Sequence, residues 1–193
     1  MTSLDFLTTA LPCEVEVSGR PVPIRTGWRR AVRTMRRDPE PSAAELLATW
    51  FSRDGELDRW ALSHADEAVE AALAWRDDAL SLALPYGERG PSRRRAWDWE
   101  ADSAIALADF RRLYGIDLRT WQAHWYDFAA LWSALAATEG SLVAEALRAR
   151  GRVPKGASKW ERKAHEAAAR AWALPPTEAE AERAALDRLR REF

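Results

Sequence analysis

Residues 118–135, LRTWQAHWYDFAALWSAL, carry the clearest apolar repeat of the chain. Large apolar side chains recur there at alternating intervals of three and four residues: Leu118, Trp121, Trp125, Phe128, Trp132 and Leu135. This spacing is typical of one face of an α-helix. A buried tryptophan removes about 150–250 Å² from water. The segment is therefore predicted to form a helix at the centre of the core.

A second helical segment precedes this one. Residues 97–114 place Trp99, Ala106 and Phe110 at helical spacing, and Gly115 follows, a residue suited to the left-handed position that ends many helices. The connection between the two segments is short, residues 114–117. The pattern therefore predicts a central antiparallel helix hairpin over residues 97–135.

The start of the chain predicts a small β-hairpin. Residues 13–17 alternate in polarity, residues 18–20 supply a turn, and the two prolines of residues 21–24 place the second strand at a sheet edge. Capping residues and apolar spacing predict further helices over residues 28–37, 42–51, 63–84, 141–150, 158–174 and 177–193.

The predicted fold is mainly α-helical. Residues 1–175 are expected to form a single, mostly helical domain with the N-terminal β-hairpin and the central helix hairpin. An exposed loop is predicted near residues 85–96, where proline, glycine and arginine replace any apolar period. Residues 176–193, which follow a double proline, are expected to form a helical extension.

The composition argues against several classes of protein. Lysine and arginine total 29 against 30 acidic residues, a net charge of −1, which disfavours a generally basic nucleic-acid binder. No apolar run approaches the ~20 residues of a membrane span, and no basic leader precedes Asp5. The single Cys13 excludes an intramolecular disulfide and fits a reducing compartment. We therefore expect a soluble cytoplasmic protein.

The sequence contains no recognisable catalytic motif. Phosphate-binding glycine loops, the nucleophile elbow and the zinc-protease motif are absent. Asp98, Glu100 and Asp102 are interpreted as acidic charge that favours a helix N-terminus rather than as a Mg²⁺ site. Each histidine lies in a separate predicted helix, with no two at ligand spacing: His64, His124 and His165. We expect no enzymatic activity, no cofactor and no metal.

Two aromatic side chains lie away from the apolar faces of their predicted helices. Trp97 lies nearly opposite Trp99, and Tyr126 lies away from the tryptophans of the central repeat. Such residues either pack against a third element, the commoner arrangement, or form a partner surface. The candidate partner-binding site comprises Trp97 and Tyr126 with a polar rim of Asp98, Glu100 and Asp127.

Charge is distributed in blocks. Residues 41–84 and 97–140 are acidic overall, whereas residues 85–96 and 141–175 are basic. These blocks are either solvated faces, the ordinary arrangement, or complementary surfaces for head-to-tail self-association. The basic segments could contact phosphates, but the acidic blocks would repel the same polyanion. Nucleic-acid binding is therefore not the expected function.

Several segments recur together in one group of tailed-phage proteins. Residues 97–102 (WDWEAD), 114–118 (YGIDL) and 124–131 (HWYDFAAL) follow one another in this order. Residues 11–17 (LPCEVEV) and 22–26 (VPIRT) precede them, and residues 172–175 (WALP) follow. In these segments the chain resembles the bacteriophage gene product fifteen family. Residues 136–157 and the residues after Pro176 depart from the family pattern.

The resemblance implies a protein encoded among the tail-morphogenesis genes of a long-tailed phage or prophage. Such proteins are similar to tail assembly chaperones, which keep the tape measure protein soluble and help recruit major tail tube subunits. The implied function is a non-enzymatic chaperone of the host bacterial cytoplasm that is absent from the finished virion. Two alternatives remain open: a minor structural tail or connector protein of the virion, and a nucleic-acid-binding phage regulator.

Overall fold

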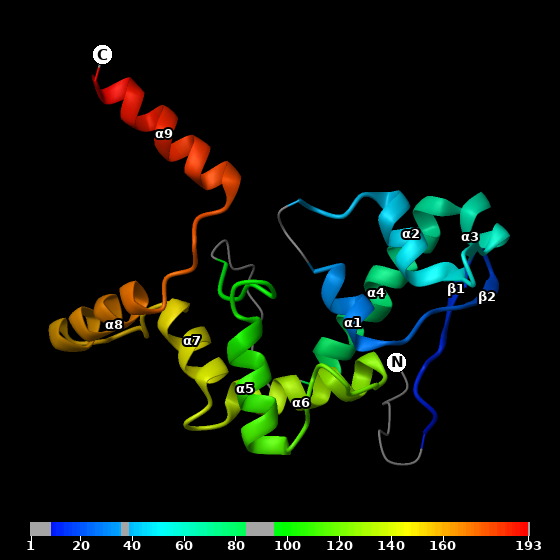
Figure 1. Ribbon diagram of the computed structural model, residues 1–193, viewed down its shortest axis with the longest axis horizontal. Helices are drawn as coiled ribbons and strands as arrows, with labels where there is room; N and C mark the ends of the chain where they lie inside the picture. Colours follow the sequence, from blue (N-terminus) through cyan, green and yellow to red (C-terminus); the bar gives the residue numbers. More distant parts are fainter. Residues whose placement is uncertain (1–8, 36–38, 84–94, 193) are drawn as a thin grey trace.

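The computed structural model describes residues 9–35, 39–83 and 95–192, and within them the chain is mainly α-helical with a small N-terminal antiparallel sheet (Figure 1). This confirms the predicted fold class. The exposed loop predicted near residues 85–96 falls almost entirely outside the described residues.

The N-terminal sheet pairs β1 (Glu14–Val17) with β2 (Arg20–Pro23). Val17 and Val22 are buried, so one face of the hairpin packs on the helices. Both turn residues, Ser18 and Gly19, have positive φ angles of 47° and 72°. A tight two-residue hairpin requires this conformation, because its twist must match that of the strands.

The N-terminal half continues through short elements to one long helix. Its elements in chain order are α1 (Trp28–Arg33), α2 (Ala43–Phe51), β3 (Ser52–Arg53), β4 (Glu56–Leu57), α3 (Arg59–Ser63) and α4 (Ala65–Ala83). The predicted capping box of α2 is present, since Ser42 and Glu45 hydrogen-bond reciprocally. Asp54 and Gly55, both with positive φ, form the turn of the small β3–β4 hairpin.

In the described residues of the C-terminal half, every regular element is a helix. Its elements are α5 (Ser103–Tyr114), α6 (Trp125–Ala137), α7 (Leu142–Arg150), α8 (Lys159–Ala171) and α9 (Glu178–Glu192). Gly115 ends α5 with a φ of 68°, in the predicted left-handed conformation.

The central apolar repeat faces the core as predicted, but its first third is not helical. Leu118 is buried and Trp121 packs against the core, yet α6 begins only at Trp125. Arg29 from α1 donates hydrogen bonds to the carbonyls of Leu118 and Arg119, at 2.8 and 2.9 Å. His124 then caps α6 by accepting from Tyr126 N. Tertiary hydrogen bonds therefore replace the predicted first helical turns.

The predicted antiparallel pair of long helices is not found. α6 packs mainly against α4, and α5 packs against α7. α5 and α6 meet where Phe110 and Phe128 stack with ring centroids 5.4 Å apart, and Figure 1 shows the two helices running in different directions. The reason is that α4, 40 residues earlier, supplies the longer apolar face against which α6 is buried.

The last two helices project from the rest of the molecule. No residue of α8 is buried. Figure 1 shows α9 leading away from α8 beyond an extended connection. α9 occupies the segment that was predicted to form a C-terminal helical extension.

Candidate functional site

Tyr126 lies in the core and not on a partner surface. Its side chain is 3% exposed, and its hydroxyl donates a hydrogen bond of 3.3 Å to the Trp75 carbonyl. Burial, with a contribution from the charge of Asp78, raises its pKa to about 12. The partner-binding prediction for Tyr126 is therefore wrong, because α4 covers the side of α6 that carries it.

Trp97 packs beside α6 in a partly exposed aromatic group, here called the tryptophan cluster: Trp97, Trp99 and Trp132. The ring centroids of Trp97 and Trp132 are 4.8 Å apart, and those of Trp99 and Trp132 are 4.6 Å apart. Trp97 and Tyr126 thus contact different elements, so the two predicted aromatics do not form one site. The Trp97 side chain packs against the core on one side and is partly exposed on the other.

The acidic residues of the predicted rim are divided between two roles. Glu100 and Asp127 are exposed. Asp98 accepts hydrogen bonds from Glu100 N and Ala101 N at 2.9 and 2.8 Å and pairs with Arg95. Burial opposes ionisation of Asp98, but these hydrogen bonds and charges outweigh it and lower its pKa. Asp98 therefore shapes the turn before α5 and does not point freely to a partner.

Asp102 forms a buried ion pair that the sequence did not reveal. Its carboxylate binds two nitrogens of Arg150 at 2.6 and 2.9 Å, and both side chains are less than a tenth exposed. Arg150 also donates to the carbonyls of Ala96 and Trp172. One guanidinium therefore joins the start of α5, the end of α7 and the residue after α8. Asp102 stands at the N-cap of α5, where the sequence predicted acidic charge, but its side chain makes no capping hydrogen bond.

Asp109 is a second buried carboxylate with a structural role. It accepts hydrogen bonds from Ser141 Oγ and Val143 N at 2.9 and 3.0 Å, at the start of α7, and pairs with Arg112 at 2.8 Å. Burial opposes its ionisation, but these donors outweigh that effect and lower its pKa. Its carboxylate is occupied by these donors and stabilises the α5–α7 contact.

His124 connects the N-terminal segment to α6. Its Nδ1 accepts from Tyr126 N at 3.2 Å, so the ring proton is assigned to Nε2, which lies 3.2 Å from the Pro12 carbonyl. Pro12 also accepts from Trp75 Nε1 at 3.1 Å. Burial lowers the pKa of His124, opposed in part by Pro12 and Asp127. The neutral ring is therefore the form that fits this junction.

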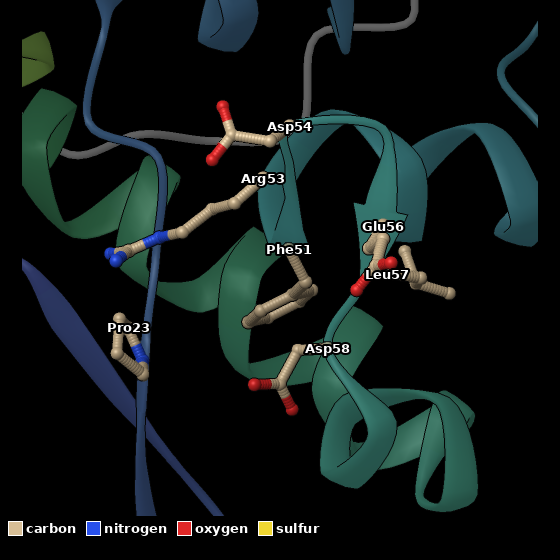
Figure 2. A pocket seen from close by; sticks show the side chains of 7 residues that line it. All are labelled: Pro23, Phe51, Arg53, Asp54, Glu56, Leu57 and Asp58. Atoms are coloured by element: carbon tan, nitrogen blue, oxygen red, sulfur yellow. The ribbon is translucent and has the colours of Figure 1, made fainter.

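A pocket lies beside the β3–β4 hairpin, and its polar side chains do not form a convergent site (Figure 2). Its lining residues are Pro23, Phe51, Arg53, Asp54, Glu56, Leu57 and Asp58. Asp58 already caps α3 by accepting from Trp60 N and Ala61 N. Asp54 and Asp58 lie at opposite ends of the pocket in Figure 2, so its carboxylates do not converge on one point.

A second pocket lies between α1 and α2. It is lined by Arg30, Arg33, Thr34, Pro39, Pro41, Glu45, Ala48 and Thr49. Burial, together with the charges of Arg25 and Arg33, lowers the pKa of Arg30. Arg25 and Arg30 also donate to the carbonyls of Ser52 and Thr49, so part of their donor capacity is used within the fold.

Exposed apolar side chains concentrate at the C-terminal end. Of the seven large apolar side chains that are exposed in the described part of the chain, five lie between residues 142 and 189. Trp160 on α8 is 78% exposed, and Leu186 and Leu189 on α9 are 49% and 52% exposed. The exposure of Trp160 could have been predicted from the sequence, because it is the one large apolar residue in a helix made mostly of alanine and charged residues.

Comparison with family models, with curated proteins and with solved structures finds no match to this chain. Within residues 9–35, 39–83 and 95–192, no group of three or more histidine, cysteine, aspartate or glutamate side chains could hold a metal ion. The helices in those same ranges are all too short or too polar to cross a membrane.

Proposed function

We propose that this protein is a non-enzymatic tail assembly chaperone of a tailed bacteriophage, which binds the tape measure protein in the host cytoplasm and helps recruit tail-tube subunits. The proposal rests on the family resemblance in segments from Leu11 to Pro175. It also draws on a partly exposed aromatic surface suited to a helical partner.

The observation that carries the proposal is that the resembling segments meet at α6. Pro12 accepts from His124, and the Thr26 carbonyl accepts from Trp125 N at 2.7 Å. Trp99 lies 5.9 Å from Phe128 between ring centroids, and Tyr114 donates to the Leu131 carbonyl at 3.0 Å. Four segments that are distant in sequence thus contact residues 124–131. Motifs that form one shared core are more specific to a fold than isolated matches, which supports the resemblance.

The tryptophan cluster is the surface that we assign to the partner. Partly exposed tryptophans beside acidic residues resemble the anchors and polar rim of protein interfaces. Trp97 contributes aromatic area, while Glu100, next to Trp99 in the chain, supplies exposed charge. An amphipathic helix of the tape measure protein would place its apolar side chains on these rings.

The direct test is co-expression of the full chain with the tape measure protein encoded in the same genome. We expect the chain to raise the soluble fraction of the tape measure protein and to co-purify with it. Trp97→Ala should weaken this capture by about tenfold or more, the effect of losing an interface anchor. Leu62→Ala, at an exposed side chain of α3, is the control and should leave capture unchanged.

Mass spectrometry of purified virions separates the proposal from its alternatives. A chaperone is absent from the particle, whereas a minor tail or connector protein is present in fixed copy number. A tape measure protein that stays insoluble in the presence of the full chain would contradict the proposed function. Duplex binding at physiological salt would instead favour a nucleic-acid-binding regulator.

A further inference from the structure

Two C-terminal helices keep their apolar sides exposed. On α8, the residues called here the Trp160 stripe recur at helical spacing on one side: Trp160, Ala164, Ala167 and Ala171. All four are exposed, whereas α8 faces α7 with the half-buried His165, Ala168 and Ala169. On α9, Ala185, Leu186 and Leu189 share one side, called here the α9 apolar face, and they too are exposed.

A helix of this length needs packing to be stable. Isolated helices shorter than about 12–15 residues are marginal in water, because nucleation is costly and few hydrogen bonds follow it, and α9 with its 15 residues is close to that limit. Every side chain of α9 that the structure describes is exposed. A contact that covers the α9 apolar face would therefore stabilise the helix itself as well as bury its leucines.

The two helices carry complementary charge. α8 holds four basic residues and two acidic ones, a net charge of +2. α9 as a whole holds five acidic and four basic residues, a net charge of −1, and its acidic residues concentrate in residues 178–187, where four acidic residues meet one basic one. Lys163 and Arg170 border the Trp160 stripe, and Glu178 and Glu182 lie at the N-terminal end of the α9 apolar face, four residues apart. Facing surfaces of opposite charge favour the pairing of these two helices.

The connection between α8 and α9 opposes their pairing within one chain. Only residues 172–177 separate them, and Pro175 and Pro176 favour an extended backbone. Arg150 binds the Trp172 carbonyl and Arg95 binds the Pro175 carbonyl, so both ends of the extended stretch are held. Figure 1 shows α9 directed away from α8. Pairing of α8 with α9 therefore requires two molecules.

We propose that α9 of one copy docks on the Trp160 stripe of α8 in a second copy of this chain. Because the same two surfaces exist on both copies, a reciprocal exchange produces a closed dimer with two equivalent contacts. The inference concerns self-association alone and holds or fails independently of the proposed phage function.

Charge reversal tests the contact with the full-length protein. We expect the parent protein to sediment as a dimer whose dissociation depends on concentration. Lys163→Glu with Arg170→Glu reverses the charge of α8, and Glu178→Lys with Glu182→Lys reverses that of α9. Each double variant should be monomeric, and an equimolar mixture of the two should form dimers again, because each mutated surface then meets an opposite charge.

Apolar truncation gives the second arm of the test. Leu186→Ser with Leu189→Ser should weaken dimerisation by about tenfold or more. Leu62→Ser, at a side chain of α3 that is 56% exposed, is the matched control and should leave it unchanged. A monomeric parent at high micromolar concentration, a dimer that survives the leucine changes, or a mixture that fails to reassociate would each overturn the proposal.

Discussion

The pH dependence of stability should reveal the role of the His124 ring. Burial lowers the pKa of His124 in the folded protein. The unfolded chain therefore binds the proton more readily just below pH 6.5, the ordinary pKa of histidine. Acidification through that range then favours unfolding. We expect urea unfolding to give a lower free energy at pH about 5.5 than at neutral pH.

His124→Gln serves as the control for this effect. Glutamine does not titrate, so the variant should lose less stability than the parent between the same two pH values, although it is less stable at both. An equal loss in the two proteins would assign the pH dependence to other groups.

Truncation of the Tyr126 side chain should lower the free energy of unfolding. Tyr126→Ala removes a ring that is 3% exposed and should cost about 3–5 kcal/mol, as for other buried aromatics. Tyr126→Phe removes the hydroxyl that donates to the Trp75 carbonyl and should cost about 1 kcal/mol. Equilibrium unfolding measures both. If Tyr126→Ala unfolds like the parent, the residue belongs to the surface after all.

At the scale of elements, Arg150 should hold α8 in place. Arg150→Met leaves Asp102 buried without its cation and removes the donor to the Trp172 carbonyl. Loss of one partner from a buried pair costs about 3–5 kcal/mol. We expect a lower free energy of unfolding and faster amide hydrogen exchange in α8.

Arg170→Met is the matched control for Arg150→Met. The guanidinium of Arg170 is exposed and lies 4.0 Å from the Glu166 carboxylate, so at concentrations where the protein is monomeric its loss should change stability by less than about 0.5 kcal/mol. Protection of α8 that is unchanged in Arg150→Met would show that the helix is held by its packing on α7 alone.

At the scale of the whole molecule, the body should fold without its last helix. The described side chains of α9 are exposed, so removal of the chain after Pro176 takes little from the core. We expect the melting temperature to shift by only a few degrees, which corresponds to about 1 kcal/mol. The comparison is made at concentrations where the parent is monomeric. An insoluble truncated protein would place α9 in the core.

The sequence by itself determined most of the element types of this protein, but not the β3–β4 hairpin, α3 or the non-helical start of the central repeat. Alternation and a turn signal located the N-terminal hairpin, capping boxes located α2 and α8, and the apolar repeat identified side chains that do face the core. These features are local, because a hydrogen bond to a residue three or four positions away, or a period of two or 3.6, is written in consecutive residues.

Only the tertiary structure decided which elements meet. α6 begins at Trp125 because Arg29, some ninety residues earlier, binds the carbonyls that another helical turn would have used. Tyr126 is buried because α4 covers it, and Asp102 is paired because α7 brings Arg150 to it. Helical periodicity states which side of a helix is apolar but not which distant segment will cover it. For that reason the sequence left Tyr126 either against a third element or on a partner surface, and the fold placed it in the core.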